Sequence, residues 1–182
     1  MRTLTRRTAM GSCAAACALA VSWPGPVVAR DSCRDGLSAG SPRVELRHVF
    51  CGEINRRGQA VGFHSRPGGV NPPTVRDTGT PRPVPGYPGL YNLTQFQIAQ
   101  DGQTGIKGIS TFFPDKCSAG DVVAAIQFAF SNGHRKEEQF RGMSGPGCTT
   151  ADGRQFPITG FTGGREGSHV RTGYPDVGGG RR

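Results

Sequence analysis

RHVFCGEINRRGQAVGFHSR, residues 47–66, is the stretch around which the rest of the chain is organised. Within it, Asn55-Arg56-Arg57-Gly58 has the residues preferred by a type I turn that closes on a left-handed glycine. We therefore expect a β-hairpin, with a first strand over Val44–Phe50 and a second strand from about Gln59 to His64.

A histidine stands near each end of this stretch. His48 and His64 are sixteen residues apart, an even number, so two-residue alternation along a hairpin places both side chains on one face. Directly opposite or diagonal positions lie roughly 5–8 Å apart. Two imidazoles at that separation can hold a phosphate, one accepting a proton while the other donates one. The same spacing also fits a surface hairpin with two unrelated histidines.

Residues 1–29 are predicted to be a signal peptide rather than part of the fold. A basic start with three arginines is followed by an apolar, small-residue run over 10–23 and by a cleavage site after Ala29. Thr5-Arg6-Arg7-Thr8 resembles a twin-arginine signal. The apolar run is too short for a stable membrane anchor, so we expect a secreted protein.

The chain is basic, with 22 lysines and arginines against 13 acidic residues and a formal net charge of +9. Loss of the signal, which holds three arginines and no acid, lowers this charge to +6. A charge of this sign favours an anionic partner, by charge alone a nucleic acid, an acidic glycan or a membrane surface.

Four cysteines remain after the signal: Cys33, Cys51, Cys117 and Cys148. An even set in an exported chain indicates two disulfides, for which three pairings exist. We favour Cys33–Cys51 with Cys117–Cys148, because each bond then closes a local loop. The spacing contains no C-x-x-C pair, which argues against a zinc site.

The remaining pattern predicts an α+β fold, an antiparallel sheet with few helices stabilised by disulfides. Ser118 starts a capping box that predicts a helix, and Asn132-Gly133 ends it. On an expected strand over Tyr91–Ile98, alternation places Tyr91, Leu93 and Gln95 on one side and Asn92, Thr94, Phe96 and Ile98 on the other. Strands are expected at Tyr91–Ile98, Ile106–Phe113, Gln155–Phe161 and His169–Tyr174.

The other segments divide the chain into an N-terminal arm over 30–43, a folded domain over 44–177 and a flexible tail over 178–182. Residues 65–90 hold seven prolines and five glycines, which excludes a long regular element. A loop of that length is usually functional or mobile, and as a hypothesis it forms one rim of a substrate groove.

Motifs for a serine nucleophile, a zinc peptidase or a phosphate-binding P-loop are absent from the sequence. What remains is an acid–base set of His48, His64, Lys107 and the hydroxyls of Thr172 and Tyr174. RNA suits such a set, because its 2′-OH is the nucleophile and the protein need supply only a base, an acid and a cation. Histidine serves both proton roles, since its ordinary pKa of about 6.5 lies close to working pH.

Three ordered blocks carry these residues. They are His48-Val49-Phe50 with Gly52-Glu53 and Gly62-Phe63-His64, then Lys107 with Ser110-Thr111-Phe112-Phe113-Pro114, and finally Val170-Arg171-Thr172-Gly173-Tyr174-Pro175. Together they resemble the EndoU endoribonucleases, which include eukaryotic poly(U)-preferring enzymes, a nidoviral uridylate-specific endoribonuclease and bacterial contact-dependent toxins. The resemblance covers most of residues 45–175 and implies that family's barnase-like core.

The resemblance also implies a catalytic set and a substrate-binding set: His48, His64 and Lys107, and Ser110, Thr172 and Tyr174. His64 would be the general base, His48 the general acid and Lys107 the cation, although the acid and base roles could be exchanged. Tyr174 would stack on a uracil ring. The implied reaction is cleavage of single-stranded RNA at uridines, which leaves a 2′,3′-cyclic phosphate. An exported toxin opposed by an immunity protein is a further expectation.

Some members of the family respond to manganese and others need no metal. The sequence shows no cluster of metal ligands, so we expect no cofactor. After His64, Ser65-Arg66 stands where eukaryotic members have an Asn-Trp pair, which leaves the substrate preference open. Glu53 is expected to support the hairpin through hydrogen bonds rather than to transfer a proton.

Two other classes of function compete with this one. A non-enzymatic secreted module would bind RNA or other polyanions through its arginines, with salt-sensitive affinity and no turnover. A secreted hydrolase could instead pair Cys51 with a histidine, but four exported cysteines favour a disulfide at Cys51.

Overall fold

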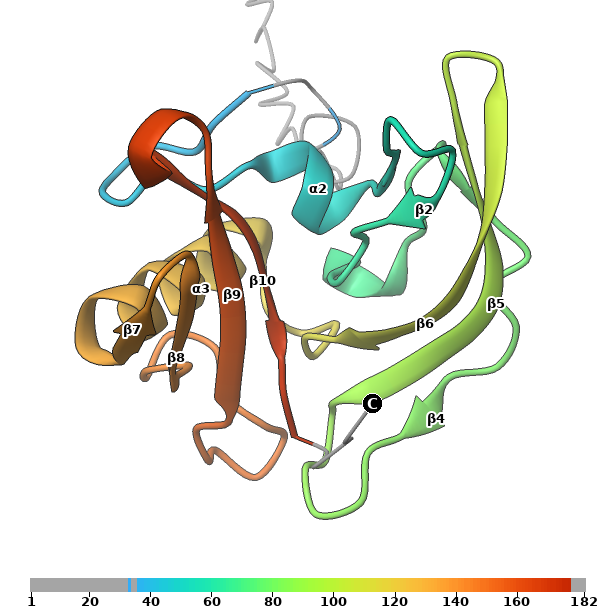
Figure 1. The fold of residues 1–182 in the computed structure, drawn as a ribbon. Helices are drawn as coiled ribbons and strands as arrows, with labels where there is room; N and C mark the ends of the chain where they lie inside the picture. The colour runs from blue at the N-terminus through green and yellow to red at the C-terminus, as the bar shows by residue number, and fades with distance from the viewer. Residues whose placement is uncertain (1–32, 34–35, 178–182) are drawn as a thin grey trace, which may run out of the picture.

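The structure is a computed structural model that describes residues 33 and 36–177. Two four-stranded sheets face each other, and a short helix lies between them at the top of Figure 1. The strands pair antiparallel and the fold is α+β, as predicted. The predicted signal peptide 1–29 and tail 178–182 lie outside the described residues. No helix within the described ranges is long and apolar enough to span a membrane.

The first sheet has the order β10-β9-β8-β7 and is covered by the long helix α3, Ala119–Asn132. Its strands are β7 (His134–Lys136), β8 (Gln139–Met143), β9 (Pro157–Gly163) and β10 (His169–Pro175), with the short 3-10 helix η2 (Arg165–Gly167) between the last two. The predicted capping box is present, because Ser118 Oγ accepts from the Asp121 N–H while the Asp121 carboxylate accepts from the Ser118 N–H. Val122 and Ile126 are fully buried against the sheet.

The second sheet is built on β5 (Tyr91–Gln100), which pairs along its length with β6 (Gln103–Phe112). On the other edge of β5 lie β3 (Val75–Arg76) and β4 (Arg82–Pro83). These short strands and the 3-10 helix η1 (Pro67–Gly69) are the only regular elements in residues 65–90, which confirms the predicted lack of a long one.

The predicted simple alternation along β5 is wrong. Gln95 has φ +54° and interrupts the pairing with β6, which resumes at Phe96 and Lys107. Buried residues therefore change from odd to even numbers, and Leu93 and Phe96 join the same hydrophobic cluster. A polar side chain in the left-handed region carries no strong signal in the sequence, so the change of face was not foreseen.

The predicted first strand over Val44–Phe50 is also wrong, because Leu46–Phe50 forms the short helix α2. Val44 does pair with Val170 on the free edge of β10, and the chain then turns into the helix. All of residues 48–52 are buried, a pattern that two-residue alternation cannot satisfy. Gly52, with φ +67°, directs the chain away from the helix end.

The predicted turn is correct, although its strands are shorter than expected. Strands β1 (Glu53–Ile54) and β2 (Ala60–Val61) pair on either side of it. Gly58 has φ +75°, and its N–H donates to Asn55 O at 2.8 Å, as a type I turn with a left-handed glycine requires. The segment Gly62–His64 lies beyond the end of β2.

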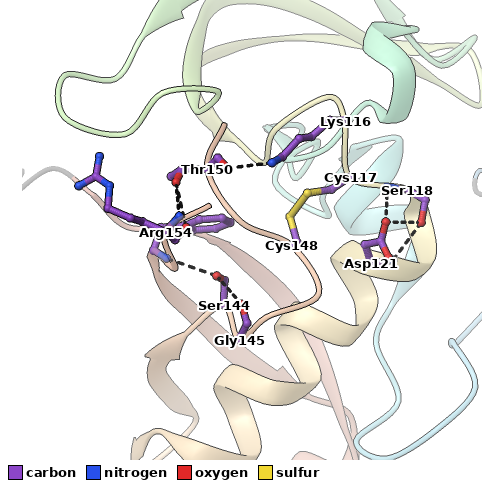
Figure 2. The surroundings of a disulfide bond; sticks show 10 residues. Lys116, Cys117, Ser118, Asp121, Ser144, Gly145, Cys148, Thr150 and Arg154 are labelled. Atoms are coloured by element: carbon purple, nitrogen blue, oxygen red, sulfur yellow. Dashed lines mark hydrogen bonds between the residues drawn. A yellow bond between two sulfur atoms is a disulfide. The ribbon is translucent and has the colours of Figure 1, made fainter. Parts of the chain in front are cut away.

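Both predicted disulfides are present. Cys33–Cys51 fixes the N-terminal arm to the end of α2, and Cys117–Cys148 fixes the start of α3 to the loop between β8 and β9. Around the second bond, Lys116 Nζ donates to Thr150 O and the Ser118 capping box lies next to Cys117 (Figure 2). Each bond therefore ties an irregular segment to a helix.

Candidate active site

His48 and His64 meet where helix α2 contacts the segment after β2. The Phe63 N–H donates to His48 O at 2.8 Å, and the His64 N–H donates to Val49 O at 2.7 Å. Both imidazoles are buried, with 6% and 7% exposure, and their ring centroids are 6.2 Å apart. The rings thus lie at the expected separation, although His48 is on a helix and His64 is outside the hairpin.

Close contact between these two segments depends on Gly62. Its φ is +74°, and a Cβ at this position would lie 2.3 Å from His48 O. A side chain here would therefore push the backbone of α2 away from the site. The next residue, Phe63, has φ +59°, and its fully buried ring packs edge-on against Phe96 and Phe112. That packing offsets the cost of a left-handed conformation just before His64.

Glu53 orients the His48 ring. Its Oε1 lies 3.0 Å from His48 Nδ1 and accepts a hydrogen bond from Arg171 Nη2, also at 3.0 Å. The hydrogen bond with His48 lowers the pKa of Glu53 to about 2, against the effect of burial and with help from the charges of His48 and Arg171. An ionised carboxylate can only accept, so His48 Nδ1 carries a proton and Nε2 is the nitrogen left for chemistry.

Ser110 orients the His64 ring. Its buried hydroxyl lies 2.8 Å from both Phe63 O and His64 Nδ1. A hydroxyl has one hydrogen, and the carbonyl can only accept, so that hydrogen goes to Phe63 O. His64 Nδ1–H must then donate to Ser110 Oγ, which leaves Nε2 unprotonated and available as a base.

The surroundings of His64 favour its neutral form. Burial lowers its pKa well below 6.5, and the positive charges of His48 and Lys107 lower it further, whereas a backbone hydrogen bond with Thr111 raises it. His64 is therefore neutral at neutral pH. The effect of Lys107 on this pKa also places its ammonium group within electrostatic reach of the ring.

Strand β6 brings Lys107 and Ser110 to the same side of the sheet. Lys107 pairs with Phe96 and Ser110 pairs with Leu93, and cross-strand partners share a face. Phe96 and Leu93 belong to one buried cluster because of the interruption at Gln95. Residues three apart on a regular strand would instead point to opposite faces. The irregularity at Gln95 is thus what places Lys107 and Ser110 on the same face of the sheet.

Strand β10 closes the other side of the site. The Tyr174 ring stacks on His64, with centroids 5.1 Å apart and planes inclined by 27°. Thr172 stands two residues earlier on the same face, and its buried Oγ1 has no hydrogen-bond partner within residues 33 and 36–177. A register shift between Val170 and Thr172 places an extra residue, Arg171, in a bulge. Bulges redirect side chains, and here Arg171 reaches Glu53.

The bacterial EndoU nuclease family matches residues 43–177, a range that contains all of these residues. The chain belongs to this family. A protein named Toxin from Bacillus cereus is 34% identical to it over 87 residues, which are 48% of this chain. The chain spans only 15% of the length of that relative. No solved structure matches the chain.

The EndoU match agrees with the three sequence blocks, which the fold brings together at one place. Two of the site's contacts were not predicted: Glu53 bonds the His48 ring instead of only supporting the hairpin, and Arg171 shares that carboxylate. Arg171 stands inside the third block beside Thr172, so its position in the motif was the available signal.

Other residues with reactive or titratable side chains lie outside this EndoU site. Cys51 is in a disulfide, which excludes a Cys–His nucleophile. Lys116 is bonded to Thr150 O, His134 is exposed on β7, and His169 faces Glu45 Oε2 at 3.7 Å. No group of three or more metal-ligating side chains occurs in the part of the chain that the structure describes.

Proposed function

We propose that this EndoU nuclease is an endoribonuclease that cleaves single-stranded RNA at uridines. One observation carries the proposal. Two buried imidazoles lie 6.2 Å apart, and in each the Nδ1 atom is occupied, by Glu53 in one and by Ser110 in the other. Each ring is therefore left with Nε2 for proton transfer, which is the requirement of a reaction with one base and one acid.

The proposed reaction uses the nucleophile that RNA itself supplies. His64 Nε2 takes the proton of the 2′-OH, the 2′-oxygen forms a bond to phosphorus, and the bond from phosphorus to the 5′-oxygen breaks. His48 Nε2–H gives its proton to that departing oxygen. The products are a 2′,3′-cyclic phosphate and a 5′-hydroxyl, and Lys107 stabilises the charge on the non-bridging oxygens.

The different surroundings of the two rings support this division of roles. His64 is kept neutral by burial and by neighbouring positive charge, as a base must be before reaction. His48 faces the carboxylate of Glu53, whose negative charge complements a protonated ring. The alternative, in which His48 is the base and His64 the acid, is therefore less favourable than the first assignment.

We assign Tyr174 and Thr172 to the uridine. An aromatic ring beside the catalytic base can stack on an unpaired nucleobase, and such stacking is common in sites for single-stranded RNA. The unbonded Oγ1 of Thr172 supplies a donor and an acceptor for the base or ribose. Ser110 is already bonded to His64 and Phe63 O, so we propose that it acts on the substrate through His64.

We also propose that the protein is an exported toxin. The relative in Bacillus cereus bears the name Toxin, and two disulfides suit an oxidising compartment. A toxic ribonuclease endangers the cell that makes it, so a cognate immunity protein is the partner we expect. Export itself rests on residues 1–29, whose basic and apolar segments resemble a signal peptide.

Cleavage of a single-uridine oligonucleotide tests the proposed chemistry. We expect the purified protein to cut an otherwise deoxyribose strand after its one ribouridine, leaving a cyclic phosphate that mass spectrometry identifies. The same strand with deoxyuridine should stay intact, because the 2′-OH nucleophile is missing. Cutting of the deoxyuridine control would contradict the proposal. Binding of both strands without cleavage would also contradict it and would favour a polyanion-binding module.

The pH dependence of kcat/KM tests the role of His64 as base. The base must be unprotonated, and its unprotonated fraction falls as pH falls through its pKa. Because that pKa is lowered, the acid-side loss of activity should lie well below pH 6.5. We expect kcat/KM to be maintained as the pH is lowered through about 6.5, measured with circular dichroism as a control for folding. An acid-side midpoint at or above 6.5 would contradict this assignment.

A further inference from the structure

We propose that a groove beside the β1–β2 turn binds the next RNA phosphate on the 3′ side of the one that is cleaved. This inference rests on the proposed ribonuclease function and extends it to a second substrate contact. The groove has a volume of about 560 Å³ and is open to solvent, which gives room for a nucleotide unit. It is lined by Glu53, Ile54, Asn55, Arg56, Arg57 and Arg171.

The charge of the groove suits an anion. Arg56 and Arg57 are exposed at the tip of the turn, and neither forms an ion pair with another residue in 33 or 36–177. Glu53, the one acid among the described residues of the lining, already accepts hydrogen bonds from His48 and Arg171. Three guanidinium groups line the groove, and since Arg171 is paired with the Glu53 carboxylate, the charges of Arg56 and Arg57 remain uncompensated. Guanidinium matches the geometry of phosphate oxygens.

The two arginines at the tip are carried by a rigid turn. Asn55 Oδ1 accepts from the backbone N–H groups of both Arg57 and Gln59, and the Ile54 N–H donates to Gln100 Oε1 on β5. The backbone of the turn is therefore fixed to the sheet without using either arginine side chain. Side chains on a fixed support lose less entropy on binding than side chains on a loose loop.

The position of the groove identifies which phosphate it would hold. Arg171 Nη2 and His48 Nδ1 each lie 3.0 Å from the same Glu53 oxygen, so these nitrogens are no more than twice that distance apart. His48 is the proposed donor to the departing 5′-oxygen. The chain that continues from that oxygen is the 3′ part of the substrate. The groove is adjacent to His48, because Glu53, which contacts the His48 ring, and Arg171 both line it.

The lining also indicates that the groove contacts backbone rather than base. Among the described residues that line it, none has an aromatic side chain on which a base could stack. Arginine contacts to phosphate raise affinity without selecting sequence. The groove would therefore hold any 3′ neighbour of the cleaved uridine, while Tyr174 and Thr172 act on the uridine itself.

Three short substrates separate this groove from the catalytic site. The first is a ribouridine followed by one deoxyadenosine, the second adds a 3′-phosphate to it, and the third adds the phosphate at the 5′ end instead. We expect the 3′-phosphate to raise kcat/KM about three- to tenfold at low salt, as a few exposed charge contacts can. The 5′-phosphate should give a much smaller change. Absence of cleavage of all three would contradict the proposed function, whereas equal cleavage would overturn the groove alone.

The double variant Arg56→Ala/Arg57→Ala tests whether the turn causes the gain. We expect the ratio of kcat/KM with and without the 3′-phosphate to fall toward one. Arg135→Ala/Lys136→Ala on the distant strand β7 removes the same charge and should keep the wild-type ratio. Arg56→Glu alone is a second variant and should also lower the ratio, with thermal melting as the control for folding. A wild-type ratio in both turn variants, or an equal loss in the β7 control, would overturn the proposal.

Discussion

His64→Ala and His48→Ala should each lower kcat/KM for a uridine-containing oligonucleotide by about 10²–10⁴-fold, the usual range for loss of a general base or acid. His64→Ala removes the neutral imidazole that we propose accepts the 2′-OH proton. His48→Ala removes the proposed donor for the 5′-oxygen and leaves Glu53 bonded only to Arg171. Single-turnover cleavage under excess enzyme measures the chemical step for each variant and avoids effects of product release.

Two comparisons make this result specific to the paired rings. The double variant should be little worse than either single one, because residues that act as a unit are strongly non-additive. His134→Ala removes an exposed histidine from β7 and should leave the rate within about twofold of wild type. Wild-type rates in both single variants, or an equal loss in His134→Ala, would contradict the mechanism.

Both histidine side chains are buried, so folding must be checked separately. Removing the His64 ring leaves Ser110 Oγ without its donor and a space beside Tyr174. His64→Gln keeps an amide in that space and cannot act as a base at neutral pH. We expect His64→Gln to melt closer to wild type than His64→Ala does, and to be as inactive as His64→Ala.

The residues of the site were predictable from the sequence because their identities and order follow a motif. Their geometry was not, since it depends on two irregularities. Gly62 lets the chain pass within van der Waals contact of α2, and Gln95 changes the buried face of β5. Both effects come from single left-handed residues. A left-handed residue changes the face to which the following side chains of the segment point. In the sequence, only glycine indicates such a conformation.

Among the helices and strands, too, some were predictable from the sequence and others were not. Helix α3 was predictable because its capping box and its apolar stripe agree with each other. Helix α2 was not, because five residues give no helical period and two of them, Val49 and Phe50, suit a strand. The hairpin β7–β8 carries three exposed residues on β7 and buries Phe140 on β8, so its pattern is dominated by charge. For helix α2 and for the hairpin β7–β8, tertiary packing decides the structure and the local sequence preference does not predict it.

Removal of the Cys117–Cys148 bond should be the most destabilising change away from the active site. The bond closes a loop with a sequence separation of 31, and the chain-entropy model gives about 3–4 kcal/mol for a loop of that size. Both sulfurs are in buried residues, and Figure 2 shows the bond holding the β8–β9 loop to the start of α3. We expect Cys117→Ala/Cys148→Ala to lower the free energy of unfolding in urea by about this amount.

The Cys33–Cys51 bond is the matched control for this prediction. Its loop has a separation of 18, so the same model gives about 3 kcal/mol, nearly equal to the first bond. The two bonds differ in place, because Cys51 caps the end of α2 three residues after His48, while Cys117 precedes Ser118, the N-cap of α3. Cys33→Ala/Cys51→Ala should therefore lower kcat/KM as well as stability, since the helix that carries His48 loses its covalent anchor. If the Cys117→Ala/Cys148→Ala protein unfolds at the wild-type urea concentration, hydrogen bonds such as Lys116 to Thr150 O hold the loop instead.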